Sequence, residues 1–248
     1  LESSSAASDV YKRQGTHLNP EFNNLDKLEK DIRKLHNYQK VFSTTYDHKT
    51  GNFTEEKKFT SKEIILVEGL HSLYRRSLNK IYDLKIYIEI EENLRKKLKI
   101  ERDIKVRNKK KDEVLKSLEA RAKDSLEFIH PQKENSDLAF RLNSVKENKV
   151  DLDVSIKNIY LDFMLFEKLL RKLNIDFVLH DYPDIRKYKI KGHLKSFLFS
   201  EIFKYFSDED IFLLSNSNSK ISQGNIGIIN LLTICLLYTS PSPRDTRR

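Results

Sequence analysis

The sequence predicts an α/β fold with a mostly parallel sheet and a smaller α+β part at the C-terminal end. Three segments have the character of strands, at residues 64–68, 85–91 and 137–142, and two helix-like segments, at residues 94–106 and 113–128, lie between the last two. Strands that alternate with helices in this way pair in parallel, because each helix carries the chain back to the same end of the sheet.

The first predicted helix covers residues 22–35, where apolar residues recur at helical spacing among charged ones. The dipeptide Asn19-Pro20 is a start signal for it. Residues 46–53 read YDHKTGNF, a composition that is typical of a turn.

Residues 64–68 (IILVE) form an apolar, β-branched run that ends in a carboxylate. They predict a buried strand that brings Glu68 to the rim of the sheet. Ligands of parallel sheets bind outside the carboxyl ends of the strands, and a carboxylate there can hold magnesium beside phosphates. A core strand whose last residue merely faces water explains Glu68 equally well.

The alternation of residues 85–91 (KIYIEIE) predicts a second strand. Residues 94–106 follow as a basic helix, which residues 108–111 interrupt before a further helix at residues 113–128. Residues 137–142 predict a short third strand.

Chemical motifs become rare beyond residue 148, so a smaller accessory α+β region is predicted for residues 149–234. Its expected elements are a strand at 150–159, a helix at 161–173, a strand at 177–179 and a helix at 194–206.

Both ends of the chain differ in character from the rest. Residues 4–14 read SSAASDVYKRQ and residues 235–245 read CLLYTSPSPRD. A DNA element that encodes DVYKRQ also encodes CLLYTS when its other strand is read in a shifted frame, and it is similar to the end of a transposase-based sequencing adapter. We therefore expect residues 1–14 and 235–248 to be adapter artefacts, and residues 15–234 to be a fragment of a longer protein.

The single cysteine, Cys235, lies in the C-terminal tail, so residues 15–234 offer no disulfide, thiol nucleophile or cysteine metal site. Of the net charge of +9, the N-terminal tail contributes none and the C-terminal tail +2, which leaves +7. This positive net charge is compatible with binding to nucleic acid, to a membrane surface or to phosphorylated small molecules. The apolar run at 226–237 is too short to span a bilayer, and we expect a cytoplasmic protein.

Three basic residues of the predicted basic helix form the most suggestive group. Lys99 and Arg102 share a helix face, and Arg107 lies near the helix end, where the chain can bend. Cations that converge on one volume suit a triphosphate or a sugar phosphate. Many lysines surround them, so charge alone favours a solvated basic helix.

The order of these motifs resembles the phosphoribulokinase/uridine kinase family of P-loop kinases, and its phosphoribulokinase branch in particular. The resemblance runs from about residue 16 to residue 142. It rests on THLNPEFNNLD, YDHKTG, VEGLHSLY, DLKIYIEI, KIERDIKVRN and LEARAKDSLEFIHPQKENSDLAF. It implies that residues 15–148 are the C-terminal portion of a kinase domain with an incomplete P-loop kinase-like sheet.

The resemblance also implies roles for individual residues. Glu68 becomes the acidic residue of the nucleotide site, where it holds magnesium directly or through water. Lys99 and Arg102 fall in a lid-like region that contacts phosphates during catalysis. The residues implied on the substrate side are Arg107, Arg121, Tyr46 and His48.

Two parts of the family pattern are absent. The sequence contains no G-x-x-x-x-G-K-[ST], the loop that cradles phosphates, and the family's catalytic aspartate precedes the matching region. We therefore expect a fragment of an ATP- and Mg²⁺-dependent kinase that phosphorylates a hydroxyl of a small sugar phosphate or nucleoside, with no activity in the fragment itself.

The alternative is a non-catalytic regulatory or scaffold protein with a kinase-like fold. Nucleic acid is a weaker candidate partner, because residues 94–127 contain no aromatic side chain among their cations. The expected partner is a small-molecule phosphate acceptor rather than a membrane, and the sequence is compatible with a homo-oligomer, since unpaired apolar strand edges promote association.

Overall fold

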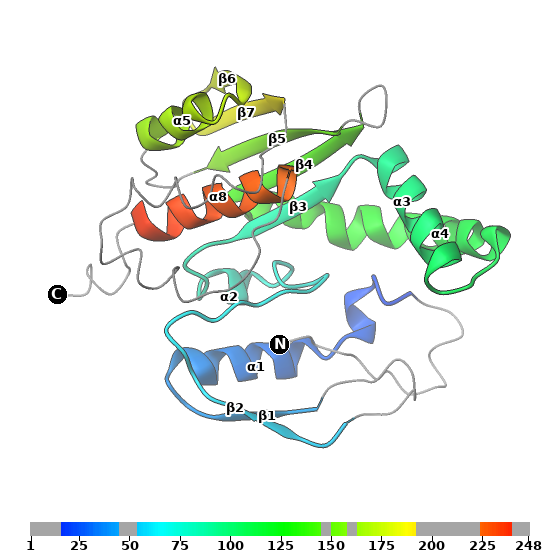
Figure 1. The fold of residues 1–248 in the computed structure, drawn as a ribbon. Helices are drawn as coiled ribbons and strands as arrows, with labels where there is room; N and C mark the ends of the chain where they lie inside the picture. Colours follow the sequence, from blue (N-terminus) through cyan, green and yellow to red (C-terminus); the bar gives the residue numbers. More distant parts are fainter. Residues whose placement is uncertain (1–15, 45–53, 145–149, 158–162, 192–223, 240–248) are drawn as a thin grey trace. The chain divides into compact units, whose positions relative to one another are not determined.

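The computed structural model describes residues 16–44, 54–144, 150–157, 163–191 and 224–239 (Figure 1). The chain forms two compact units. The first unit contains Leu1–Lys85 and Lys96–Ser136, and the second contains Ile86–Arg95 and Asp137–Arg248.

The first unit is mainly helical in its described part. Its elements are α1 (Leu25–His36), β1 (Val41–Ser43), β2 (Lys57–Phe59), α2 (Arg76–Asn79), most of α3 (Glu92–Lys105) and α4 (Lys111–Asp124). A π-helical turn (Ser125–Ile129) and a 3-10 turn (His130–Asn135) follow α4. The three predicted helices in this part are confirmed, whereas the predicted turn at 46–53 lies outside the described residues.

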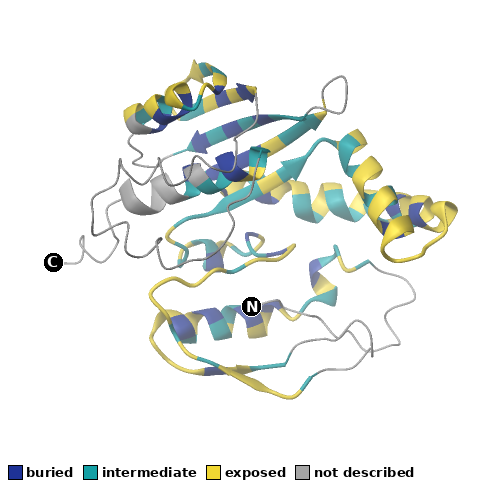
Figure 2. Ribbon diagram, in the orientation of Figure 1, coloured by how far each residue is buried: buried dark blue, intermediate teal, exposed yellow. Residues whose placement is uncertain are grey.

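Helix α1 forms because its apolar residues line one face and both of its ends are capped. The Asn24 side chain accepts a hydrogen bond from the Lys27 N–H at the start. At the end, Tyr38 adopts a left-handed backbone with φ of 60°, and the N–H of Gln39 donates to the Lys34 carbonyl at 2.8 Å. The apolar face, dark in Figure 2, packs in one core cluster made of Leu25, Leu28, Ile32 and Leu78.

The predicted buried strand at residues 64–68 is wrong. Residues 63 and 64 form a bend, residues 65–68 are irregular, and most of the chain between β2 and α2 is exposed (Figure 2). A strand needs a neighbour that takes up its backbone N–H and C=O groups, and none of the described strands pairs with this segment. Only Val67 of this run packs against the core cluster of α1 and α2.

One buried amide holds the loop that follows this segment. The Gln132 side chain accepts a hydrogen bond from the Leu73 N–H at 3.2 Å and donates to the carbonyls of Leu70 and Phe128, both at 2.8 Å. Asn135 and Asn79 both donate to the Leu73 carbonyl at 3.0 Å. These bonds fix residues 70–73 although they have no regular secondary structure.

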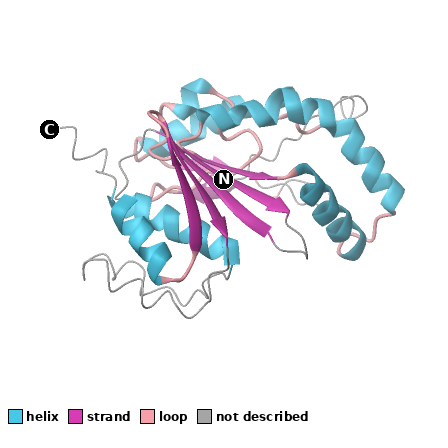
Figure 3. Ribbon diagram, turned by 90° about the horizontal axis from the view of Figure 1, so that it is seen from above, coloured by secondary structure: helices cyan, strands magenta, loops and turns pink. Residues whose placement is uncertain are grey.

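The second unit is built on a five-stranded sheet with the order β3-β4-β5-β7-β6, whose strands fan out with a twist in Figure 3. Its elements are β3 (Ile86–Ile90), β4 (Leu138–Ser144), β5 (Val150–Lys157), α5 (Phe163–Lys172), β6 (Asp176–Asp181), β7 (Ile185–Lys191) and α8 (Gly224–Thr239). Predictions for β3, β4, β5, α5 and β6 are confirmed, strand β7 and helix α8 were not predicted, and the helix expected at 194–206 lies outside the described residues.

The α/β class is confirmed, but the parallel part of the described sheet is smaller than expected. Strands β3 and β4 pair in parallel, whereas the pairs β4–β5, β5–β7 and β6–β7 are antiparallel. Connection length explains the difference. The chain between β3 and β4 includes α3 and α4, whereas only a few residues join β4 to β5 and β6 to β7. Strand β5 therefore pairs with β4 along the whole length of β4 and extends the same sheet.

The sheet of the second unit buries one face. Along β5 the side chains of Leu152, Val154 and Ile156 are buried and those between them are less so. Helix α5 covers this face, since the Phe166 ring meets the Tyr188 ring edge-on at 5.4 Å between centroids. Among the helices that the structure describes, none has the length and apolar character needed to cross a membrane.

The three hydrogen bonds of the Gln132 side chain, called the Gln132 clamp below, lead to a stability prediction. Gln132→Ala leaves a buried N–H and two partly buried carbonyls without their partner, so we expect the free energy of unfolding to fall by about 2 kcal/mol. Urea unfolding followed by circular dichroism measures the change. Gln39→Ala, at an exposed position, is the matched control and should change stability little. Equally small losses of stability in Gln132→Ala and Gln39→Ala would contradict a stabilising role of the Gln132 hydrogen bonds.

Candidate functional site

The basic residues of α3 gather around a buried carboxylate that the sequence interpretation did not single out. The Asp103 side chain is almost fully buried. It accepts hydrogen bonds from the Arg102 guanidinium, at 3.0 Å from Nε and 2.9 Å from a terminal nitrogen, and lies 3.5 Å from Arg107. Both guanidiniums remain about half exposed, so each can still meet a ligand from solvent.

Arg107 lies one helical turn after Asp103, which brings the two side chains to the same face, and the chain turns directly after it. Asn108 adopts the left-handed conformation with φ of 51°, which asparagine tolerates better than most residues. The N–H of Lys109 donates to the Asp103 carbonyl at 3.0 Å and closes this turn. The expected bend at the helix end is therefore confirmed.

Nearby positive charges stabilise the ionised form of the Asp103 carboxyl group. Burial alone would raise the pKa of its carboxyl group, but the hydrogen bond from Arg102 and the neighbouring positive charges of Arg107 and Lys99 hold the pKa below its usual value. Arg121 of α4 also lies within electrostatic reach of Asp103, and burial lowers the pKa of its guanidinium. Four cations therefore surround one carboxylate in the first unit.

His17 lies within electrostatic reach of two of these cations. Desolvation, followed by the positive charges of Arg121 and Lys99, lowers the pKa of the His17 imidazole. Thr16 donates a hydrogen bond of 2.6 Å to Asp124 at the end of α4, which ties the His17 segment to that helix.

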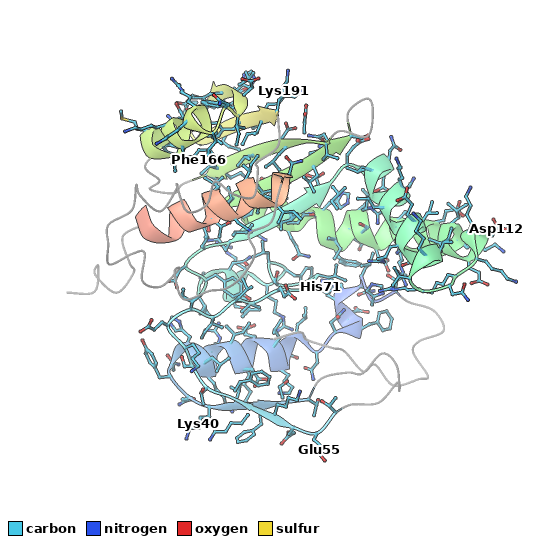
Figure 4. All side chains as sticks on the ribbon, viewed as in Figure 1. Lys40, Glu55, His71, Asp112, Phe166 and Lys191 are labelled. Atoms are coloured by element: carbon cyan, nitrogen blue, oxygen red, sulfur yellow. The ribbon has the colours of Figure 1, made fainter. Side chains whose placement is uncertain are left out.

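His71, labelled in Figure 4, connects the loop after Glu68 to this segment. Its Nε2 lies 3.3 Å from the His17 carbonyl oxygen, and its ring packs edge-on against Tyr74. The ring is almost fully buried, and Nδ1 has no hydrogen-bond partner among the described residues. Burial, which outweighs the hydrogen bond to His17, lowers the pKa of this imidazole.

The remaining predicted site residues are less constrained. Glu68 is exposed three positions before His71 and makes no hydrogen bond or ion pair to another described residue. Tyr46 and His48 lie outside the described residues. In the part of the chain that the structure describes, no group of three or more His, Cys, Asp or Glu side chains could hold a metal ion. A cation such as Mg²⁺, which binds through one or two carboxylates plus phosphates, does not require such a group.

This arrangement is suited to binding an anion with several oxygens. Arg102 and Arg107 keep part of their donor groups in solvent, and guanidinium groups bind phosphate oxygens in a two-pronged geometry. A sequence signal for Asp103 existed, since Lys99 and Arg107 stand four positions before and after it on a helix. No local signal identified His17 or Gln132.

The buried His71 ring makes stability depend on pH. Its pKa is lowered in the folded state, so the unfolded chain binds more protons once the pH falls below the ordinary value of 6.5. Stability should be constant above that pH and decrease below it, by at most about 1.4 kcal/mol per pH unit for one proton.

His71→Gln should make this decrease shallower, as measured by urea unfolding at a series of pH values, and the part that remains includes the contribution of His17, whose pKa burial also lowers. His180→Gln, on the exposed side of β6, should leave the original pH dependence in place. A curve for His71→Gln that runs parallel to the original would show that His71 titrates normally in the folded chain.

Comparison with known proteins identifies the family of the chain. The family model described as "Phosphoribulokinase / Uridine kinase family" matches residues 3–151. The phosphoribulokinase of Synechocystis sp. is 31% identical over 140 residues, which cover 54% of this chain and 42% of the relative. The uridine kinase of Clostridium tetani is 30% identical over 134 residues, which cover 53% of this chain and 63% of the relative. The chain thus spans only part of the length of these relatives.

The fold has a similar counterpart among solved structures. The phosphoribulokinase from Rhodobacter spheroides superposes with a TM-score of 0.57 and 19% identity, over 77% of this chain and 72% of that one. This confirms the predicted kinase-like α/β fold. Because the family model covers more than half of the sequence, the chain belongs to the phosphoribulokinase/uridine kinase family.

Proposed function

We propose that this chain is part of an ATP-dependent kinase that transfers the γ-phosphoryl group to a hydroxyl of a small sugar phosphate or nucleoside. The observation that carries the proposal is the group of four cations, Lys99, Arg102, Arg107 and Arg121, around the buried carboxylate of Asp103. Family membership and relatives named as phosphoribulokinase and uridine kinase support it.

The cations would act on charge that develops during transfer. Phosphoryl transfer needs little covalent chemistry from the protein, so positioning and charge stabilisation supply most of the catalysis. Lys99 and Arg102 would neutralise the transferring phosphate, while Arg107 and Arg121 would hold the acceptor. Asp103 would keep Arg102 and Arg107 in place between catalytic cycles, since it contacts both guanidiniums.

Glu68 would hold magnesium, directly or through water. The carboxylate is exposed and makes no ion pair with a described residue, so it has coordination sites to offer. Magnesium held there by Glu68 would supply positive charge that offsets the charge of the phosphate oxygens. Tyr46 and His48 would stand on the acceptor side.

The phosphate-binding loop and the general base would come from sequence that is not in this chain. No G-x-x-x-x-G-K-[ST] occurs in the sequence, and that absence favours a second candidate, a regulatory or scaffold protein with a kinase-like fold. Sequencing the gene upstream decides between the two: an intact loop of this kind preceding residue 16 supports the kinase, and a continuous reading frame without one supports the scaffold.

The role of the basic cluster is tested in the protein that the upstream sequencing defines, when its reading frame includes the phosphate loop. Charge-assisted contacts to phosphate contribute about 1.5–3 kcal/mol each, so Arg102→Ala should lower kcat/KM about tenfold or more. Lys110→Ala removes one positive charge from an exposed position a few residues away and should change kcat/KM little.

Steady-state kinetics with purified variants measures both values. Equal small effects would mean that the segment acts only as a basic surface, and a salt-dependent gel shift with RNA would then be the next measurement.

Glu68 allows a second test in the same protein. Glu68→Gln keeps the shape of the side chain but removes the charge at the metal, which stabilises the transition state more than the ground state. We expect kcat to fall by about tenfold or more while the Kd for the nucleotide changes far less. An unchanged kcat would show that Glu68 is only an exposed residue after the apolar run.

A further inference from the structure

Side chains from distant parts of the chain hold the backbone of His17 in place. Its carbonyl oxygen accepts a hydrogen bond from the Asn23 amide at 3.0 Å and lies 3.3 Å from Nε2 of His71. One residue earlier, the Thr16 hydroxyl donates to Asp124 at 2.6 Å. These contacts fix the point from which the His17 imidazole projects, although none of them involves the ring.

The imidazole of His17 is accessible to a ligand. The residue is exposed, and its ring forms no hydrogen bond with another described residue, so both ring nitrogens are available. The backbone and Thr16 make the contacts that order this segment, so the fold does not depend on the ring. A side chain of this kind, on a loop that is fixed by other groups, is well placed for binding.

The surroundings of the ring are positively charged. The charged or titratable groups that act on it are Arg121 of α4, Lys99 of α3 and the His71 imidazole, and Asp124 is bonded to the segment through Thr16. The cations disfavour a proton on His17, and this adds to desolvation in lowering its pKa. An anion bound to the same cations has the opposite effect, because its negative charge favours the protonated ring.

We propose that His17 is an anion-binding residue of this site and takes up a proton from solvent when a phosphate-like dianion binds to the cations beside it. The protonated imidazole has a second N–H donor and a positive charge, so the anion gains a charge-assisted hydrogen bond. His17, Lys99 and Arg121 all belong to the first unit. The inference rests on the anion-binding role that the proposed function gives to the cations, and it adds a residue that this function does not include.

Titration of the ring in the full chain tests the proposal directly. Sulfate is the probe, because it resembles a phosphate dianion and keeps its charge over the range in which histidine titrates. NMR spectra of the imidazole C–H groups are recorded over a pH series, and the signal that is missing from His17→Gln identifies His17. Without sulfate, its pKa should lie below the ordinary value of 6.5. Saturating sulfate should raise this pKa by about one pH unit or more, whereas sodium chloride of the same ionic strength should not.

The affinity for sulfate gives a second, independent measurement. Because binding takes up a proton, the Kd for sulfate should increase with pH, by up to about tenfold per pH unit between the pKa values of the free and the bound chain. Isothermal titration calorimetry at constant ionic strength measures this dependence. His17→Gln should remove it. His36→Gln, at an exposed position at the end of α1, should keep it.

Three results would overturn the role of His17: sulfate that does not move its pKa, a pH dependence of the Kd that survives in His17→Gln, or one that is lost only in His71→Gln. Arg102→Ala separates this inference from the proposed function. If sulfate binding weakens in Arg102→Ala but does not respond to His17, only the role of His17 is wrong. If the chain binds no sulfate, or if Arg102→Ala binds it equally well, the anion-binding role of the cations is wrong too.

Discussion

The buried carboxylate of Asp103 is the interaction on which the candidate site depends. Residues 95–111 contain ten basic and two acidic side chains, so the segment strongly repels itself. Asp103 offsets part of that repulsion at short range, because it contacts Arg102 and Arg107 and lies within electrostatic reach of Lys99 and Arg121. A buried carboxylate in turn requires such partners to remain ionised. The site is therefore a cluster of cations arranged around one carboxylate rather than a uniform basic surface.

Polar side chains, rather than secondary structure, hold the loops beside this group. Gln132 satisfies the Leu73 N–H and the Leu70 carbonyl in a stretch that belongs to no helix or strand, and it joins this stretch to the Phe128 carbonyl of the π-helical turn. His71 and Thr16 tie that stretch and the His17 segment to their surroundings. An amide can serve both donors and acceptors at once, which explains why one Gln132 side chain can order several loop residues. Loops that are fixed in this way keep functional groups in place while their backbone stays accessible.

Connection length determines the direction of the strands in the second unit. A long helical crossover between β3 and β4 produces the parallel pair, and short connections produce the antiparallel pairs β4–β5 and β6–β7. Strands β5 and β7 are also antiparallel, although α5 and β6 lie between them in the chain. The run at residues 64–68 has the composition of a strand but not the structure of one, because composition cannot supply a neighbouring backbone. A segment thus becomes a strand only when a neighbouring strand pairs with it.

The sequence by itself determined the features that depend on neighbours along the chain. Helical periodicity identified α1, α3, α4 and α5, alternation identified β3 and β5, and six ordered motifs identified the family. The tertiary structure alone decided which residues meet across long separations. The contact of His71 with His17 and the hydrogen bonds of Gln132 join segments that are far apart in sequence. Residues 64–68 form no strand because none of the described strands lies beside them as a partner. Local patterns carry no information on such partners, because burial and pairing are settled only when the whole chain has folded.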